Sequence, residues 1–333
     1  MLADPFARLR RDDPVHWHVP SSAWLVTRHD DVRTLLADRR LSSQTGAERA
    51  DALTRWPALA ALYGDFLSMT DGSRHRELRQ ALAPVFAAGR LAAWEPELER
   101  IARACAAAAG DATEYAARYS VASLCALLGV RRDEVAWLRA RVTPLVGLLA
   151  GAPPDEARLS DADRALSQLR AHLAEAPQGM APARPLLSDV ADPHLRVALF
   201  VQLFSGGLDP VTSCLAGALD DLAGTAPDAR GWLRDEASLE TGVDELVRRH
   251  GPFPVLPRVV AAPVEVRGRL LGAGDRVLLA IGAANLDETA YADPHRFSLD
   301  RETAHLSFGW GPHRCPAAGL ARMQVRVALR AVA

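Results

Sequence analysis

The sequence predicts a mainly α-helical fold with small β-sheets, on the strength of three observations. Apolar residues recur at helical spacing, as at Trp94, Leu98, Ile101 and Cys105. Runs rich in β-forming residues are short and confined to two places. The composition, 49% hydrophobic and 24% charged, is typical of a globular protein with a large core, and 333 residues allow one domain or two.

The elements follow in order along the chain. A short strand is predicted over 23–27, and a β-rich run punctuated by glycines over 264–280. The proline-rich segment 174–193 indicates a loop between helices. Residues 197–208 are apolar nearly all round, which predicts a buried central helix rather than an amphipathic surface helix.

Charge and cysteine usage exclude several classes of protein. The 39 basic residues against 41 acidic ones give a net charge of −2, which disfavours a nucleic-acid partner. The four cysteines are far apart and predict neither a zinc site nor disulfides. The N-terminus carries acid and proline where a signal peptide has an apolar run, and no uninterrupted apolar stretch has the ~18 residues of a membrane span. We therefore expect a soluble cytoplasmic protein that binds no membrane.

The strongest motif is Phe-Gly-Trp-Gly-Pro-His-Arg-Cys over 308–315. It indicates a glycine-rich turn that delivers Cys315 to the start of a helix beginning at Pro316. A thiol at a helix N-terminus has a lowered pKa, and its thiolate form ligates metals. Gly309 and Gly311 would let the backbone approach a flat ligand. The alternative is that Cys315 is a small buried hydrophobe and the glycines only form a turn.

Together with Gly-Leu-Ala-Arg over 319–322, this motif resembles the haem-binding signature of the cytochrome P450 family, bacterial soluble type. The resemblance implies one domain over 1–333, with heme b (iron protoporphyrin IX) between the central helix and the Cys-loop helix. It implies that Cys315 ligates the iron and that Phe308, Gly309 and Gly311 contact the haem. The sequence ends before the C-terminal segment usual in the family, so we expect a more open substrate pocket or one that a partner or substrate closes; the alternative is that the sequence is a truncated form.

Two further segments resemble structural parts of that family. Glu245-Leu-Val-Arg248 matches its Glu-x-x-Arg helix. Pro294-His-Arg296-Phe297 matches the segment whose arginine completes the same ion network, which assigns that role to Arg296. Without the resemblance, Glu245 and Arg248 at i,i+3 would be interpreted as a solvated salt bridge.

Four cationic residues are candidates for binding the haem propionates. His75 and Arg79 are one helical turn apart, so one helix face presents two donors that could hold carboxylates. Alone, the pair would be an ordinary exposed charge cluster. The resemblance implies a propionate-binding role for both residues and for Arg258 and His313.

The end of the central helix departs from the family pattern. Residues 206–210, Gly206-Gly207-Leu-Asp209-Pro210, resemble the oxygen-activating stretch in which an acid is followed by threonine. Pro210 lacks an N–H and clashes with the carbonyl of Gly206, so we expect a kinked helix. Loss of the threonine hydroxyl is expected to lower productive O–O cleavage and raise uncoupling.

Neighbouring side chains are not expected to replace that hydroxyl. Ser213 lies a turn further along and Thr212 points to another side of the helix. Asp209 in an apolar helix is interpreted as functional, because an unpaired buried carboxylate is costly. The alternative is an ion pair with a nearby arginine.

The resemblance implies a monooxygenase that hydroxylates or oxidatively couples a small organic molecule, with a secondary metabolite as the expected substrate. A ferredoxin-type protein would supply electrons to a monomer, and Arg76, Arg296 and Arg314 are candidates for a basic face that binds it. The alternative is that these three are ordinary solvated surface arginines. One alternative, favoured by Pro210, is a haem-thiolate enzyme that uses peroxide or needs no dioxygen. Another is a non-catalytic binding module that keeps the fold.

Overall fold

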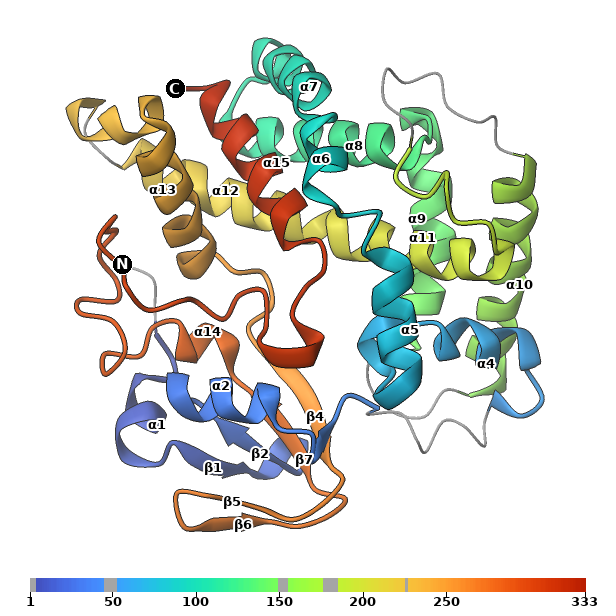
Figure 1. The fold of residues 1–333 in the computed structure, drawn as a ribbon, viewed down its shortest axis with the longest axis vertical. Coiled ribbons are helices and arrows are strands. Elements are labelled where there is room, and N and C mark those ends of the chain that lie inside the picture. The colour runs from blue at the N-terminus through green and yellow to red at the C-terminus, as the bar shows by residue number, and fades with distance from the viewer. Residues whose placement is uncertain (1–3, 45–52, 149–154, 176–184, 225–226) are drawn as a thin grey trace. The chain divides into compact units, whose positions relative to one another are not determined.

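A computed structural model describes residues 4–44, 53–148, 155–175, 185–224 and 227–333. The chain forms two compact units (Figure 1). The first, called here the sheet unit, comprises Met1–Thr45, Ser213–Ala318 and Ala333. The second, called the helical unit, comprises Gly46–Thr212 and Gly319–Val332. Each unit therefore combines segments that are distant in sequence.

A mixed five-stranded sheet organises the sheet unit within the described residues. Its strand order is β1-β2-β7-β4-β3; β2 and β7 are parallel and the other neighbours are antiparallel. β5 and β6 form a separate antiparallel pair. The strands are β1 (Val15–His18), β2 (Ala23–Val26), β3 (Leu41–Ser42), β4 (Leu256–Val260), β5 (Val264–Val266), β6 (Arg269–Leu271) and β7 (Arg276–Leu279).

The helices α2 and α14 pack with the strands of this sheet in one apolar core. Val26 of β2 and Val277 of β7 are fully buried. They pack in one cluster with Val32 of α2 and with Leu306, which lies in the loop between α14 and η5. α2 contacts both β7 and α14 (Figure 1). The helices of the sheet unit are α1 (Ala7–Asp12), η1 (Val19–Ser21), α2 (His29–Ala37), η4 (Pro227–Arg234), α13 (Glu236–Arg249), α14 (Ile281–Ala284) and η5 (Gly311–His313).

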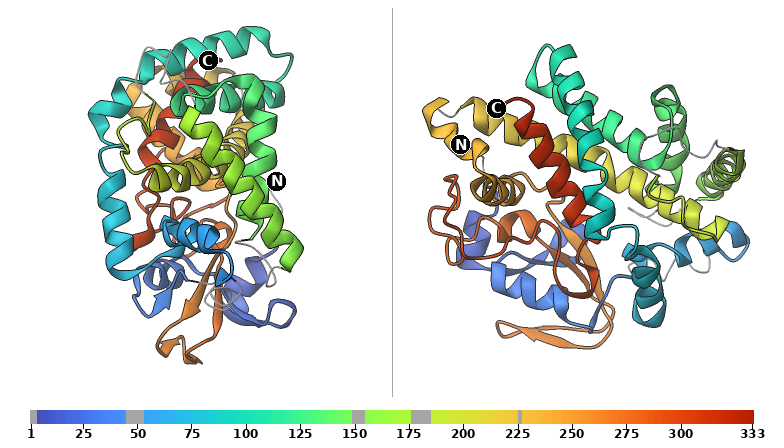
Figure 2. Two further views of the ribbon diagram at one scale, coloured as in Figure 1. Left: turned by 90° about the vertical axis from the view of Figure 1, so that its right-hand side faces the viewer. Right: turned by 45° about the horizontal axis from the view of Figure 1, so that its top comes forward.

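The helical unit is built around α11. α4, α8, α9 and α10 all contact this helix, and Figure 2 shows the green helices stacked beside it. α11 begins where the Asp192 carboxylate accepts a hydrogen bond from the His194 N–H at 2.8 Å, and proline occupies the first helical position. The helices are α4 (Pro57–Gly64), η2 (Leu67–Met69), α5 (Gly72–Leu82), α6 (Ala88–Ala92), α7 (Glu95–Ala108), α8 (Ala112–Leu128), η3 (Arg132–Glu134), α9 (Val135–Gly147), α10 (Glu156–Glu175) and α11 (Pro193–Gly207).

Two helices extend past the division between the units. The division falls inside α12 (Asp209–Ala223) and at the start of α15 (Ala318–Arg330). The stretch Pro193–Ala223 contains an 18-residue window with a mean hydropathy of 1.2, enough to span a membrane by length and composition. Half of that window is buried inside the protein.

The mainly helical fold with small sheets is confirmed. β2 occupies the strand predicted at 23–27, and β5, β6 and β7 occupy the predicted 264–280 run. Strands β1, β3 and β4 were not predicted from the sequence. β3 has only two residues, and β4 contains Pro257, a residue normally confined to edge or irregular strands. Of the predicted 174–193 loop, residues 176–184 lie outside the described residues, and 185–192 are not helical.

Candidate functional site

The loop that carries Cys315 is closed by its own main chain. Cys315 donates its N–H to the carbonyl of Phe308 at 2.8 Å, which brings the two ends of the 308–315 motif together. Gly309 donates to the carbonyl of Leu306 at 2.8 Å, and Arg314 donates to that of Gly311 at 3.1 Å. The loop therefore has a defined conformation set by hydrogen bonds within the motif.

The middle of the loop is seated on α2. Gly311 has a φ of +68°, and a Cβ at this position would lie 2.8 Å from the Cα of Ala37. The guanidinium of Arg33 lies 4.3 Å from the centre of the Trp310 ring, a cation–π contact. α2 therefore excludes a side chain at position 311. The expectation that Gly311 lets the backbone approach a flat ligand stays a prediction.

The thiol of Cys315 differs from the other three, and all four lie among the described residues. Cys105, Cys125 and Cys214 are buried, whereas Cys315 is half-exposed. Burial raises the pKa of Cys105, that of Cys125 to about 11 and that of Cys214 to about 12, so these thiols stay protonated. Cys315 is therefore the cysteine that is not fully buried, and its role as a metal ligand stays a prediction.

The helix after Cys315 begins later than predicted. α15 starts at Ala318 rather than at Pro316, and Cys315 precedes it by three residues. The Ala318 N–H reaches the carbonyl of Cys315 at 3.4 Å and forms a turn before the helix. Since the effect of the helix dipole falls off within one turn, the helix end acts less on Cys315 than expected.

Glu245 and Arg248 of α13 form a buried ion pair. Both side chains are 1% exposed, with Nε to Oε2 at 2.6 Å and Nη2 to Oε1 at 2.8 Å. Arg248 also donates to the main-chain carbonyls of Asn285 and Pro294, and its guanidinium lies 4.9 Å from the Tyr291 ring centre. This bidentate geometry contradicts the solvated-pair interpretation and agrees with a structural ion network.

The arginine that completes this network was predicted wrongly. Arg301 places Nε 3.4 Å from Oε1 of Glu245, and its guanidinium donates to the carbonyls of Ala292, Asp293 and Arg296. Arg296 contributes only its main chain to these contacts, and its side chain is exposed. The later arginine takes the role because its side chain returns toward Glu245 after the turn at 293–296.

The four cationic residues proposed for propionates are distributed over both units. In the helical unit, His75 of α5 is buried and Arg79 is half-buried, so His75 does not belong to an exposed charge cluster. In the sheet unit, Arg258 of β4 is buried and donates to the carbonyl of Pro257 at 2.8 Å. His313 lies in η5, two residues before Cys315.

The central helix is interrupted, as predicted from Pro210. α11 ends at Gly207, Leu208 has ψ of −74°, and α12 begins at Asp209. This break places Pro210 in the first turn of a new helix, where a missing N–H costs little. The Thr212 hydroxyl donates to the carbonyl of Leu208 at 2.9 Å, so it is engaged by the main chain at the break.

The glycines before the break meet different surroundings. A Cβ on Gly206 would contact nothing within 4 Å, whereas one on Gly207 would lie 3.2 Å from Cδ1 of Leu124 in α8. Gly206 thus faces open space, and Gly207 permits close packing of α11 against α8.

Asp209 is not a buried, unpaired carboxylate. Its side chain is 69% exposed and pairs with Arg139 of α9, with Nη2 to Oδ1 at 2.9 Å. The expectation of a desolvated acid was wrong because Asp209 is the first residue of α12, where it points into solvent. The alternative interpretation, an ion pair with an arginine, is correct.

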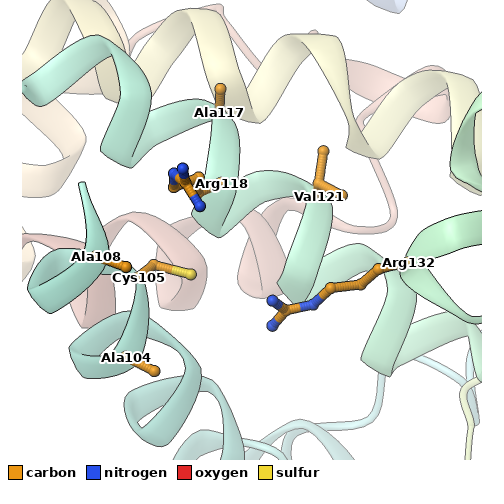
Figure 3. A pocket seen from close by; sticks show the side chains of 7 residues that line it. All are labelled: Ala104, Cys105, Ala108, Ala117, Arg118, Val121 and Arg132. Carbon is orange, nitrogen blue, oxygen red and sulfur yellow. The ribbon is translucent and has the colours of Figure 1, made fainter. Parts of the chain in front are cut away.

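A hollow of about 400 Å³ lies in the helical unit, apart from the predicted site residues of that unit (Figure 3). Alanines and Val121 form an apolar lining, while Arg118 and Arg132 project toward it. Arg118 is paired with Glu114 at 2.5 Å, and burial raises the pKa of the Cys105 thiol. The hollow therefore offers no nucleophile for catalysis.

Comparisons with known proteins agree on one family. The family model for cytochrome P450 matches residues 238–332. A putative cytochrome P450 126 of Mycobacterium tuberculosis is 31% identical, and the match covers 97% of this chain and 84% of that protein. Mycinamicin IV hydroxylase/epoxidase of Micromonospora griseorubida is 30% identical, with 98% and 86% covered.

Solved structures give the same result. The crystal structure of CalO2 matches with a TM-score of 0.80 and 25% identity, and the match covers 98% of this chain and 86% of CalO2. P450 StaH from glycopeptide antibiotic A47934 biosynthesis matches with a TM-score of 0.75 and 26% identity over 99% of this chain and 88% of StaH. With relatives of this identity over nearly its whole length, the chain belongs to the cytochrome P450 family.

Proposed function

We propose that the thiolate of Cys315 would hold the iron of heme b in this P450-type monooxygenase. Membership of the family establishes a haem-iron cofactor and oxidation of a small organic substrate. The observation that carries the assignment of Cys315 is its position as the one half-exposed thiol, in a loop closed by the 2.8 Å Cys315–Phe308 hydrogen bond. Cysteine thiolate is an established ligand of iron in proteins, and the loop offers this group at Cys315.

Haem, when bound, would supply the redox chemistry of monooxygenation, in which two electrons, two protons and dioxygen give the oxidised substrate and one water. The chain supplies the ligand and the charges. Phe308, Gly309 and Gly311 would border the porphyrin, and the cations of His75, Arg79, Arg258 and His313 would bind its propionates. We infer a single domain over 1–333, because both units are discontinuous in sequence.

The absorption spectrum of the reduced protein with carbon monoxide tests this ligand assignment. The haem-loaded wild type is expected to show a strongly red-shifted Soret band, and Cys315→Ala to lack it. Cys105→Ala is the matched control, because it removes a buried thiol that should not ligate iron. A red-shifted band that survives in Cys315→Ala would overturn the assignment.

The substrate class is proposed from the relatives. Mycinamicin IV hydroxylase/epoxidase and 6-deoxyerythronolide B hydroxylase are each about 30% identical over 98% of this chain. Their names describe the oxidation of bacterial secondary metabolites, so we propose such a compound here, hydroxylated or oxidatively coupled. A panel of such compounds, assayed by the shift of the Soret band on binding, tests the proposal.

The electron donor is proposed to be a ferredoxin-type protein that binds a cytoplasmic, monomeric enzyme. Arg76 of the helical unit and Arg296 and Arg314 of the sheet unit are all exposed, so each is accessible to an acidic partner. The four cysteines, all among the described residues, form no disulfide with one another, which suits a reducing compartment. Charge reversal at each arginine is expected to slow reduction by ferredoxin mainly at low salt, because screening weakens the attraction of exposed charges.

The stretch Gly206–Gly207–Asp209–Pro210 is proposed to control oxygen use. Pro210 stands in place of threonine, and the Thr212 hydroxyl is hydrogen-bonded to the carbonyl of Leu208. We therefore expect uncoupling, in which many of the electrons delivered to the enzyme are consumed without forming product. Pro210→Thr should raise the yield of product per NADH consumed several-fold. Pro210→Ala is the matched control, since it relieves the same backbone restraint without adding a hydroxyl. Equal yields in both variants would contradict the role of the hydroxyl.

A second candidate function is oxidation driven by peroxide. The specific observation in its favour is the helix break at Leu208 together with Pro210, which removes the usual alcohol. Turnover with hydrogen peroxide but not with reduced ferredoxin would establish it. Turnover with ferredoxin and dioxygen alone would exclude it.

A further inference from the structure

We propose that Asn285 is a positioning residue that holds the base of the cysteine loop so that Cys315 can ligate iron. The proposal rests on the function proposed for Cys315. Asn285 follows α14, far from the motif in sequence, and its side chain is buried.

The Asn285 amide binds the loop through both of its polar atoms. Oδ1 accepts a hydrogen bond from the Leu306 N–H at 2.8 Å. Nδ2 donates to the hydroxyl of Ser307 at 2.8 Å and more weakly to the carbonyl of Arg248 at 3.3 Å. One side chain therefore fixes two consecutive residues directly before Phe308.

The same contacts tie the loop to α13. The Ser307 hydroxyl donates to the carbonyl of Val247 at 2.7 Å, and Arg248 donates to the main-chain carbonyl of Asn285. A Cβ on Gly251 would lie 2.6 Å from the Ser307 oxygen, so the chain is tightly packed at this point. Asn285 thus connects the buried Glu245–Arg248 ion pair to the loop.

The connection reaches Cys315 through the main chain. Leu306 accepts the hydrogen bond of Gly309, and Phe308 accepts that of Cys315, both at 2.8 Å. The segment 306–308 is therefore the platform on which the second half of the loop closes. A shift of this segment moves Phe308, which accepts the hydrogen bond from the Cys315 N–H, and therefore also moves the Cys315 sulfur.

A merely structural role for Asn285 makes a different prediction. A buried amide that only stabilises the sheet unit would lower the melting temperature on removal and leave the haem ligand unchanged in the folded protein. A positioning role predicts that folded protein loses thiolate ligation faster. The distinguishing readout is the rate at which the red-shifted Soret band of the reduced, carbon-monoxide-bound protein decays, measured well below the melting temperature.

Two substitutions at Asn285 form the main test. Asn285→Leu removes both hydrogen-bonding atoms at similar volume, and we expect decay of the red-shifted band to accelerate roughly tenfold, because the buried Leu306 N–H loses its acceptor. Asn285→Asp keeps an acceptor for that N–H but loses the donor to Ser307, so its rate is expected to lie between wild type and Asn285→Leu.

Gln202→Leu is the matched control. Gln202 of α11 also clamps a loop with its amide: Oε1 accepts from the Leu67 N–H at 2.8 Å, and Nε2 donates to the Asp65 carbonyl at 3.1 Å. It lies in the helical unit and has no hydrogen bond to the cysteine loop. Its substitution is expected to lower the melting temperature while the decay rate of the band stays within about twofold of wild type.

Ser307→Ala covers the case in which Asn285→Leu does not fold. It removes one contact of the Asn285 amide and is expected to accelerate decay about threefold. Decay at the wild-type rate in Asn285→Leu, or in Ser307→Ala when the former is insoluble, would overturn the proposal. If wild type shows no red-shifted band at all, the ligand assignment of Cys315 fails instead, so the two failures are distinguishable.

Discussion

The Glu245–Arg248 ion pair of the sheet unit and the Arg139–Asp209 ion pair of the helical unit join the same chemical groups in different surroundings. Both side chains of the first pair are 1% exposed, whereas those of the second are 50% and 69% exposed. Desolvation makes a buried charge strongly dependent on its partner, while water replaces the partner of an exposed one. The first pair therefore fixes structure, and the second leaves Asp209 free to change partners.

A third carboxylate lies between these extremes. Asp221 of α12 is 25% exposed and binds Arg249 through Nε at 2.6 Å and His250 through Nε2 at 2.8 Å. Burial alone would raise the pKa of Asp221, but hydrogen bonds from His250 and Arg249 outweigh it and hold the pKa well below its usual range. If burial governs the effect of losing a charge, the loss of unfolding free energy on substitution by the matching amide should be largest at Glu245, smaller at Asp221 and smallest at Asp209.

The largest loss of stability is expected for Glu245→Gln. It leaves Arg248 buried without its counter-charge, and breaking a buried pair in this way costs about 3–5 kcal/mol. Urea denaturation followed by circular dichroism measures the free energy of unfolding. A loss below about 1 kcal/mol would show that burial does not separate the two pairs.

Asp221→Asn is expected to cost about 2 kcal/mol at neutral pH, as is typical of hydrogen bonds to a charged group. The pKa of Asp221 is depressed on folding, so its contribution is fully present above the unfolded pKa of about 4 and is lost as pH falls through the folded value. The difference in unfolding free energy between wild type and variant should therefore shrink below about pH 4. A difference that stays constant down to pH 3 would contradict this reading.

Asp209→Asn should have the smallest effect on stability, below about 1 kcal/mol, because exposed ion pairs contribute little. Arg139→Gln should cost the same, and both costs should fall further as salt rises. If activity nevertheless drops in Asp209→Asn while the unfolding free energy is unchanged, the carboxylate acts in turnover rather than in folding.

A double-mutant cycle sharpens the last result. The coupling between Asp209→Asn and Arg139→Gln is expected to be within about 0.5 kcal/mol. The same cycle on Asp221→Asn and Arg249→Gln should give a coupling above about 1 kcal/mol, since these side chains are largely buried. Equal coupling energies for the two pairs would show that burial does not determine how strongly an ion pair contributes to stability.

Local pattern determined much of the candidate site. The cysteine motif, the Glu-x-x-Arg spacing and the proline that interrupts the central helix are all short-range features. Each acts through the geometry of a single turn or helix, so the sequence alone predicted that Glu245 and Arg248 share a helix and that the central helix is interrupted near Pro210. It nevertheless set the start of the helix after Cys315 at Pro316 rather than at Ala318.

Tertiary structure decided which groups meet. Arg301 rather than Arg296 reaches Glu245, Asp209 pairs with Arg139, and Asn285 holds Leu306. Each of these contacts joins residues separated by many positions, and its existence depends on the path of the chain between them. Periodicity defines which face of one helix is apolar, but burial of a charge depends on what another segment places against it. That is why the sequence by itself singled out the cysteine loop as the candidate site, and only the fold showed how this loop is held.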